Sequence, residues 1–482
     1  MKGSTLDYAI IGFYLIGIAV FGIISGGKQK TVKDYFLGSK KVPWWAVCFS
    51  IVAAETSTLT FISIPGLAYI SNLNFLQVTF GYLIGRIIIA LVLLPAYYKG
   101  ELKTAYTFLE QRFGEKTRSL ASVVFLFTRI AADGVRLFAT AIPLKLMINI
   151  SYPQAIILVA VIALIYTYTG GVKGVIWVDV VQMATYLGGA IIAAIFLLNL
   201  IPGGWSAVIE TANSANKLAI INYGFENGFS GFFNQPYTLI AGILGGAFLS
   251  MASHGTDQLI VQRLLTAKDL KSGQKAIIGS GIIVIIQFTL FMLVGIMLYT
   301  YYGVMDVKSD TVFPMFIIEA MPPGIFGIII AGLFAASLST VAGSISSLSS
   351  STMMDLFLPF FGKNISEIAQ LKISRMFSVL WTFLLIGMAL FFMNTSQTVV
   401  ELALSIASFT YGGLLGTFLL GILVKNAKQE DALAGFVAGI FIMITVISLK
   451  VVAWTWFTFI GVCATLIVGG FLSLLSKQES KK

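Results

Sequence analysis

Apolar runs of about 20 residues recur along the whole chain, and each could cross the ~30 Å hydrocarbon core of a bilayer as a helix. Hydrophobic residues fill 57% of the 482 positions, charged residues only 11%, and the mean hydropathy is +0.92. A soluble protein of this length would need far more charge to cover its surface. The sequence therefore predicts an all-α polytopic membrane protein that lies in the lipid bilayer.

The apolar runs divide into thirteen expected spans. They cover residues 6–26, 43–71, 75–97, 119–148, 154–169, 174–201, 236–262, 276–302, 323–354, 376–393, 397–423, 431–449 and 452–475. The longest polar interval, at about 201–236, is too short for a large soluble domain.

The net charge of +10 follows the expected topology. Most Lys and Arg residues, Arg263 among them, fall in alternate loops, whereas the other side has Lys2, Lys217, Lys308 and Lys450. Because cytoplasmic loops carry the excess of positive charge, we expect the N-terminus outside and the C-terminus in the cytoplasm. The basic charge is then no sign of nucleic-acid binding, and the sequence indicates no obligate protein partner.

The residues that usually carry chemistry do not predict an enzyme. Cys48 and Cys463 lie in apolar spans and predict neither a disulfide nor a metal site. His254 is the single histidine, so the chain cannot build a histidine-based metal cluster, and no glycine-rich phosphate loop follows a strand.

Two of the spans are interrupted by polar residues at matching places. The second span, VCFSIVAAETSTLTFISIPGLAY, is broken at 55–58, and five spans later ILGGAFLSMASHGTDQLIVQR is broken at 245–246 and 253–257. Inverted five-helix repeats, each with a discontinuous first helix at the binding site, are typical of secondary transporters. The alternative is two independently kinked helices.

The repeat interpretation divides the chain into five parts. They are an accessory helix with its cytoplasmic loop at 1–42, a first repeat at 43–201, an extracytoplasmic loop at 202–235, a second repeat at 236–423, and two accessory helices with a cytoplasmic tail at 424–482.

A serine-rich stretch, AASLSTVAGSISSLSSS, lies in the ninth span. On a helix, Ala336, Ser339 and Thr340 share one face, and an unwound turn at 53–57 would release carbonyl oxygens. Hard cations such as Na⁺ favour carbonyl and hydroxyl oxygens, so these two segments predict a small cation site. The alternative is that small residues only permit close helix packing, the role that we expect for Ser344, Ser346 and Ser349.

Three motifs together resemble the sodium:solute symporter family, which includes the sodium/glucose cotransporters and bacterial sialic acid and proline symporters. They are GGVKGVIWVDVVQ (170–182), TDQLIVQR (256–263) and AGLFAASLSTVAGSISSLSSSTMMD (331–355), and the stretch 34–65 is similar to the start of the family's first repeat. The resemblance implies the leucine-transporter-type inverted repeat of 5+5 helices, here with one extra N-terminal and two extra C-terminal helices, and Na⁺-driven alternating access.

The resemblance also implies a sodium site. Its ligands would be the carbonyls of Ala53, Thr56 and Ala336 and the hydroxyls of Ser339 and Thr340. Some relatives hold a second sodium ion with two more hydroxyls and the aspartate of the WVDVVQ motif. Here that aspartate is Asp179, but the hydroxyl positions are Ala342 and Gly343. We therefore expect one Na⁺ per solute and a network role for Asp179.

The solute should lie beside the two broken helices. The candidate contacts are Glu55, Ser57, Thr60, Phe75, Thr79, Ser250, Ser253 and His254, although His254 could equally hold the structure together. Asp133 can meet either Arg129 or Arg136 along one helix face, as a structural ion pair or with one arginine left to bind a carboxylate. Arg86 could pair with Glu55.

These observations favour a Na⁺-coupled symporter of a small polar organic solute, with sugars, polyols, sialic acid-like solutes and other carboxylates all open. The alternatives are a proline-type amino-acid symporter, an uncoupled facilitator, and a membrane sensor on the same fold.

Overall fold

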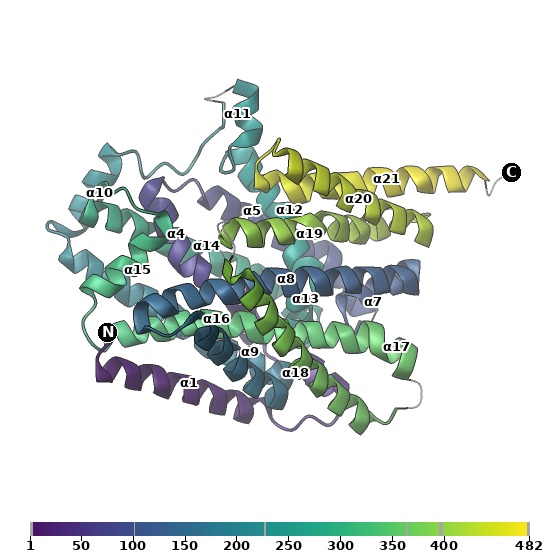
Figure 1. Cartoon of the computed structure of the whole chain (residues 1–482). Helices are drawn as coiled ribbons and strands as arrows, with labels where there is room; N and C mark the ends of the chain where they lie inside the picture. The colour runs from purple at the N-terminus through teal and green to yellow at the C-terminus, as the bar shows by residue number, and fades with distance from the viewer. Residues whose placement is uncertain (1–2, 101, 226–227, 363–364, 395–398, 480–482) are drawn as a thin grey trace.

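The computed structural model describes residues 3–100, 102–225, 228–362, 365–394 and 399–479, and these form a bundle of helices (Figure 1). Within these ranges the β pairing amounts to an isolated bridge between Val42 and Ala267. The prediction of an all-α fold is confirmed. Among the described residues, 8 helices are long and apolar enough to cross a membrane, or 9 if the bent pair at 44–55 and 60–70 is one span. The count of thirteen spans stays a prediction, and the first two residues of the eleventh expected span lie outside the described residues.

The first half of the chain forms the helices from α1 to α11. They are α1 (Thr5–Gly26), α2 (Val32–Leu37), α3 (Trp44–Glu55), α4 (Thr58–Ile70), α5 (Leu76–Ile88), α6 (Leu94–Lys99), α7 (Ala105–Phe113), α8 (Glu115–Ile148), α9 (Tyr152–Leu200), α10 (Gly204–Ser214) and α11 (Gly228–Asn234). A π-helical turn, Ile89–Leu93, joins α5 to α6.

The second half begins with a π-helical turn at Ala241–Gly245. It continues with α12 (Gly246–Gly255), α13 (Gln258–Leu265), α14 (Leu270–Tyr302), α15 (Ser309–Ala320), α16 (Ile325–Ser351), α17 (Leu358–Phe361), α18 (Glu367–Phe391), α19 (Val399–Leu423), α20 (Gln429–Leu449) and α21 (Phe457–Glu479). A π-helical turn at Thr352–Phe357 links α16 to α17, and short 3₁₀ turns lie at Gly38–Lys40, Phe392–Asn394 and Trp454–Trp456.

The fifth and sixth expected spans meet without an intervening loop. Gly171 gives α9 a kink with φ 58° and ψ −164°, a backbone conformation that glycine adopts without strain. A Cβ at this position would also lie 2.7 Å from the Tyr35 carbonyl of α2. Gly171 therefore both turns the chain and lets α2 pack against the kink.

The serine-rich helix α16 runs through the middle of the bundle and packs against α9, α8 and α1 (Figure 1). Every residue from 329 to 351 is buried. Its hydroxyls therefore face protein rather than lipid, as their concentration in one span indicates.

The N-terminal end of α16 is held by α1. The Asp7 carboxylate accepts hydrogen bonds from the amides of Gly324 (2.7 Å) and Gly327 (2.8 Å), at the first turn of α16. These amides have no partner within the helix, and a carboxylate there also suits the helix dipole. The start of α1 and the end of α21 lie at opposite ends of the bundle (Figure 1).

One assignment made from the topology is wrong. Arg263, counted above as a loop cation, is 1% exposed and lies within α13, where the Asp179 carboxylate of α9 compensates its charge. Arg263 lies between an apolar span and the basic stretch that begins at Lys268. Its charge alone therefore could not distinguish it from the lysines of the loop.

Candidate functional site

The first broken helix opens between α3 and α4, which are bent by 65° at this point. The Thr56 amide closes the last turn of α3 on the Val52 carbonyl (2.9 Å), but the Ser57 amide donates to the Thr60 hydroxyl (3.5 Å). Among the described residues, the Ala53 carbonyl therefore lacks the helical partner that Ser57 would supply. The predicted interruption and the release of a carbonyl oxygen are both present.

The second broken helix opens between α12 and α13. The break lies at Thr256 and Asp257, and the Asp257 carboxylate accepts from the Leu259 amide (2.9 Å) to cap α13. The earlier pair Gly245 and Gly246 forms part of a continuous π-to-α helical segment, so only the later of the two expected interruptions breaks the helix.

The predicted sodium residues come together between α3, α9 and α16. Ala53, Thr56, Ala336 and Ser339 line one small cavity of about 10 Å³, which Gln182, Met183, Tyr186 and Ala335 complete. Thr340 lies next to it, and its hydroxyl donates to the Ala336 carbonyl (3.1 Å). The Thr56 hydroxyl forms hydrogen bonds with both atoms of the Gln287 amide (2.9 and 3.2 Å). These bonds fix the broken turn against α14.

The Asp179 carboxylate is fully buried next to this cavity and pairs with Arg263. One oxygen accepts from Ser339 (2.6 Å), and the other accepts from Ser50 (2.5 Å) and from the Arg263 guanidinium (3.0 Å). A Cβ on Gly343 would lie 2.8 Å from the same guanidinium. Arg263 thus fills the space beside Asp179 and Gly343.

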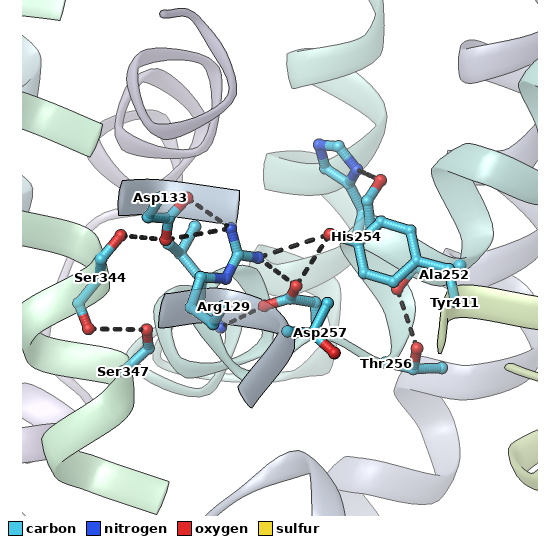
Figure 2. A network of polar contacts seen from close by, with 12 residues as sticks. Arg129, Asp133, Ala252, His254, Thr256, Asp257, Ser344, Ser347 and Tyr411 are labelled. Atoms are coloured by element: carbon cyan, nitrogen blue, oxygen red, sulfur yellow. Dashed lines mark hydrogen bonds and ion pairs between the residues drawn. The ribbon is translucent and has the colours of Figure 1, made fainter. Parts of the chain in front are cut away.

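A second charged network lies beside α16 (Figure 2). Arg129 lies between Asp133, at 3.3 Å, and Asp257, and the Asp257 carboxylate also accepts from the Tyr411 hydroxyl (3.0 Å). Arg136 reaches Asp133 at 3.2 Å, so Asp133 meets both arginines rather than one of them. The network joins α8, α13 and α19.

Two of the three serines expected to serve packing alone have polar partners on other helices. Ser344 donates to the Asp133 carboxylate, and Ser346 accepts from the Gln262 amide (3.1 Å). Ser349 donates only to the Ile345 carbonyl of its own helix (2.6 Å), as a packing serine does. The expectation is wrong for Ser344 and Ser346, because their partners come from distant parts of the chain.

Glu55, at the end of α3, forms a third charged group with Arg86 and His254. One carboxylate oxygen pairs with Arg86 and lies 3.3 Å from the His254 Nε2, while the Ser253 hydroxyl lies 2.7 Å from the other ring nitrogen. Arg86 is fully buried and also donates to Ser280 of α14 (2.8 Å). This group ties the end of α3 to α5 and α12, and the pairing of Arg86 with Glu55 is confirmed.

The other candidate solute contacts differ in what they can offer. Ser57 and Thr60 are partly exposed at the break. Thr79 is buried and donates to the Leu76 carbonyl of its own helix (2.8 Å), and Phe75 stacks on Phe288 with ring centroids 5.3 Å apart. The buried Ser250 hydroxyl has no partner within the described part of the chain.

Known proteins with similar sequences identify the family of this chain. A sequence model of the sodium:solute symporter family matches residues 35–439. The sodium/sialic acid symporter NanT of Aliivibrio fischeri is 30% identical over 99% of this chain and 94% of its own length, and SiaT of Proteus mirabilis is 28% identical over 90% and 88%. The human sodium-coupled monocarboxylate transporter 1 is 29% identical over 91% of this chain and 73% of its own length.

Solved structures agree with the sequence relatives. A substrate-bound, outward-open structure of a Na⁺-coupled sialic acid symporter superposes with a TM-score of 0.90, at 26% identity, and covers 98% of each chain. The nucleobase-cation-symport transporter Mhp1 has a TM-score of 0.58 at 12% identity over 90% of this chain and 92% of its own, which shows the fold alone.

Fold and relatives together define a multi-pass membrane transporter rather than an enzyme. The chain belongs to the sodium:solute symporter family. It couples Na⁺ to the transport of a solute, and Na⁺ is its coupling ion.

Proposed function

We propose that this chain takes up a small polar solute bearing a carboxylate, together with one inward-moving Na⁺, by alternating access. We base the choice of solute on the hydrogen bonding and exposure of the Arg136 guanidinium. Its side chain is 25% exposed, and only its Nη1 is bonded, to Asp133. Within the described ranges its other two nitrogens have no partner, so they can bind a carboxylate while the ion pair stays intact.

The position of Arg136 supports this role. Its carbonyl accepts from the Thr140 hydroxyl one turn later (3.0 Å), and Thr140 in turn reaches the Thr58 hydroxyl in the first turn of α4 (3.4 Å). Arg136 therefore lies close to the first broken helix. Relatives named for sialic acid and monocarboxylates favour an acid of one of these kinds over a proline-type amino acid, although an amino acid also bears a carboxylate that Arg136 could bind.

Polar groups at the α3–α4 break would meet the rest of the solute. The Glu55 side chain is 17% exposed, and its Oε1 has no hydrogen-bond partner among the residues that the structure describes. Since Arg86 balances the charge of Glu55, this oxygen can accept from a solute hydroxyl without strongly repelling an anion. Ser57, Thr60, Ser253 and His254 complete the proposed contacts, whereas Phe75, Thr79 and Ser250 would act as a wall.

For the ion, we propose the five oxygens of Ala53, Thr56, Ala336, Ser339 and Thr340. Four of these residues line the same cavity, and the ligand types suit a hard monovalent cation. The cavity connects the broken helix to α16, so a bound Na⁺ would fix the relative position of the two segments. This link is what couples the ion to the solute at the neighbouring break.

The proposal includes inverted repeats at 43–201 and 236–423, with accessory helices before and after them. It also includes an N-terminus outside the cell and a C-terminus in the cytoplasm. The two breaks, at 56–57 and 256–257, each lie in the first expected span of their segment, which supports this proposal. Rocking of one repeat against the other around this region would expose the site to either side of the membrane.

Arg136→Lys tests the choice of solute. The lysine keeps the charge of the Asp133 network but loses the planar fork of the guanidinium, so folding should be preserved. We expect the affinity for a carboxylate such as sialic acid or lactate to fall roughly tenfold or more, the effect of losing a hydrogen bond to a charged group. Calorimetric titration of the purified protein in Na⁺ buffer measures this, and an unchanged affinity for every acid bound by the wild type would contradict it.

The coupling ratio follows from Arg263. Its guanidinium is a fixed positive charge beside Asp179, so a second Na⁺ there would meet like charge and no free oxygen shell. With one Na⁺ per solute, uptake of a monocarboxylate moves no net charge, whereas a neutral solute would carry one charge inward. One charge is worth roughly 2.3 kcal/mol per 100 mV.

Proteoliposomes with a clamped membrane potential test the ratio. Uptake of a transported monocarboxylate should not change when an inside-negative potential is imposed, and the reversal potential for a neutral solute should give a ratio of one. Monocarboxylate uptake that rises with the potential would require a second Na⁺ and a further set of ligands.

A further inference from the structure

The Gln182 amide is an unexplained polar group in the interior. The residue is 1% exposed, and its amide has a loose contact with the Tyr166 hydroxyl, but within the described residues its Oε1 has no hydrogen-bond partner. Burying an amide without partners is costly, and nearly all buried side-chain amides in proteins are paired. The Gln182 Oε1 is therefore a buried acceptor that lacks a donor or a cation.

The place of this amide indicates which ligand. Gln182 lines the same small cavity as Ala53, Thr56, Ala336 and Ser339. The cavity of about 10 Å³ has room for one ion or water and no more. Tyr186, one turn further along α9, also lines it, and its hydroxyl has no partner within the described part of the chain.

The face of α9 that carries Gln182 is already directed toward the sodium residues. Asp179 lies three residues earlier, hence on the same side of the helix, and accepts from the Ser339 hydroxyl (2.6 Å). That bond uses the hydrogen of Ser339 and leaves its oxygen lone pairs for a cation. The Asp179 carboxylate itself is saturated by Arg263 and Ser50, so it is not the group that offers an open oxygen to the cavity.

We propose that the Gln182 amide oxygen is an additional ligand of the transported Na⁺, as a sixth oxygen beside the five proposed above. A neutral amide oxygen is the same donor type as a backbone carbonyl, which suits a hard cation. The amide can direct its oxygen toward the ion while its nitrogen keeps the Tyr166 hydroxyl as a partner. This inference rests on the proposed sodium site and adds a residue from α9 to it.

The test uses Na⁺ alone as the probe. Thermal unfolding of the purified full chain is followed while Na⁺ replaces choline at constant ionic strength, because a ligand that binds the folded state stabilises it. Gln182→Leu keeps most of the volume but removes both polar atoms. The apparent dissociation constant for Na⁺ should rise roughly tenfold, the effect of losing one hydrogen bond or contact to a charged group.

Two further variants separate a ligand from a packing residue. Gln182→Glu retains an oxygen at the same place and should bind Na⁺ at least as tightly as the wild type. Met183→Leu changes an apolar side chain of the same cavity at nearly constant volume, and it should alter the Na⁺ dissociation constant less than about twofold. The preference for Na⁺ over Li⁺ should change in Gln182→Leu and not in Met183→Leu.

The outcomes distinguish this inference from the proposed function. If Gln182→Leu binds Na⁺ with the wild-type constant, or is destabilised equally in choline and in Na⁺, Gln182 holds only a water or its own packing and the inference fails. If Gln182→Leu does not fold, a weaker Na⁺ constant in Gln182→Glu overturns the inference, and an equal or tighter one supports it. If the wild-type chain shows no Na⁺-dependent stabilisation, the proposed sodium site itself is wrong.

Discussion

Replacing Arg263 with methionine should remove most of the transport activity and strongly destabilise the chain. The guanidinium bonds to Asp179 at 3.0 Å, to Ser50 at 2.8 Å and to the Leu259 carbonyl at 2.8 Å, and the pair is almost fully buried. Removing one partner of a buried ion pair typically costs about 3–5 kcal/mol, because the other charge is left uncompensated. Thermal unfolding and uptake by reconstituted protein measure the two effects.

The double variant Asp179→Asn/Arg263→Met is the control for this prediction. It removes the stranded charge, so it should recover a large part of the lost stability. Its affinity for Na⁺ should stay below that of the wild type, since asparagine is a weaker acceptor for the Ser339 hydroxyl. A single variant as stable as the wild type, or a double variant no better than the single one, would show that the pair does not act as described.

Replacing both Ser339 and Thr340 with alanine should raise the Na⁺ concentration needed for half-maximal uptake by roughly a hundredfold. Each change removes one proposed oxygen ligand, and losing one contact to a charged group is worth roughly tenfold, with the two effects adding only approximately. Folding should be preserved, because α16 keeps its apolar contacts and Asp179 keeps Arg263 and Ser50. Uptake across a Na⁺ titration in proteoliposomes measures the effect.

Two matched controls accompany this pair. Thr340→Ser keeps the hydroxyl and should leave the half-saturating Na⁺ concentration close to that of the wild type. Ser349→Ala removes a buried hydroxyl from the same helix that donates only to the Ile345 carbonyl, so it tests the cost of any serine loss in α16. If Ser349→Ala shifts the Na⁺ dependence as much as Ser339→Ala, the hydroxyls support the helix rather than the ion.

Local patterns in the sequence predicted the parts of the site that depend on one segment. The polar interruption near residues 55–58 predicted the break between α3 and α4. A helix at membrane depth can unwind only beside protein or a wet cavity, and polar residues in a span indicate such surroundings. The shared face of Ser339 and Thr340 follows from helix geometry alone. The i+3 and i+4 spacing around Asp133 likewise predicted that it could meet either arginine, and in the structure it meets both.

Contacts between distant segments could not be predicted in this way. Arg263 is separated from Asp179 by 84 positions, and Gln287 from Thr56 by 231, so no local pattern relates them. Arg263 also resembled a loop charge, because it follows an apolar span and precedes the basic stretch that begins at Lys268. Gln182 ends the motif GGVKGVIWVDVVQ, but a glutamine in a span indicates no ligand until the structure shows that its buried oxygen lacks a partner.

The most direct test of Na⁺ coupling at the α3–α4 break is a linkage measurement on the purified wild-type chain. A solute panel that includes sialic acid, lactate and neutral sugars is titrated in Na⁺ and in choline, and Na⁺ is titrated with and without the solute that binds. If the ion fixes the break that the solute contacts, Na⁺ should tighten solute binding by roughly 5–150-fold, and the solute should tighten Na⁺ binding by the same factor. Equal solute affinity in Na⁺ and choline would contradict the proposed coupling.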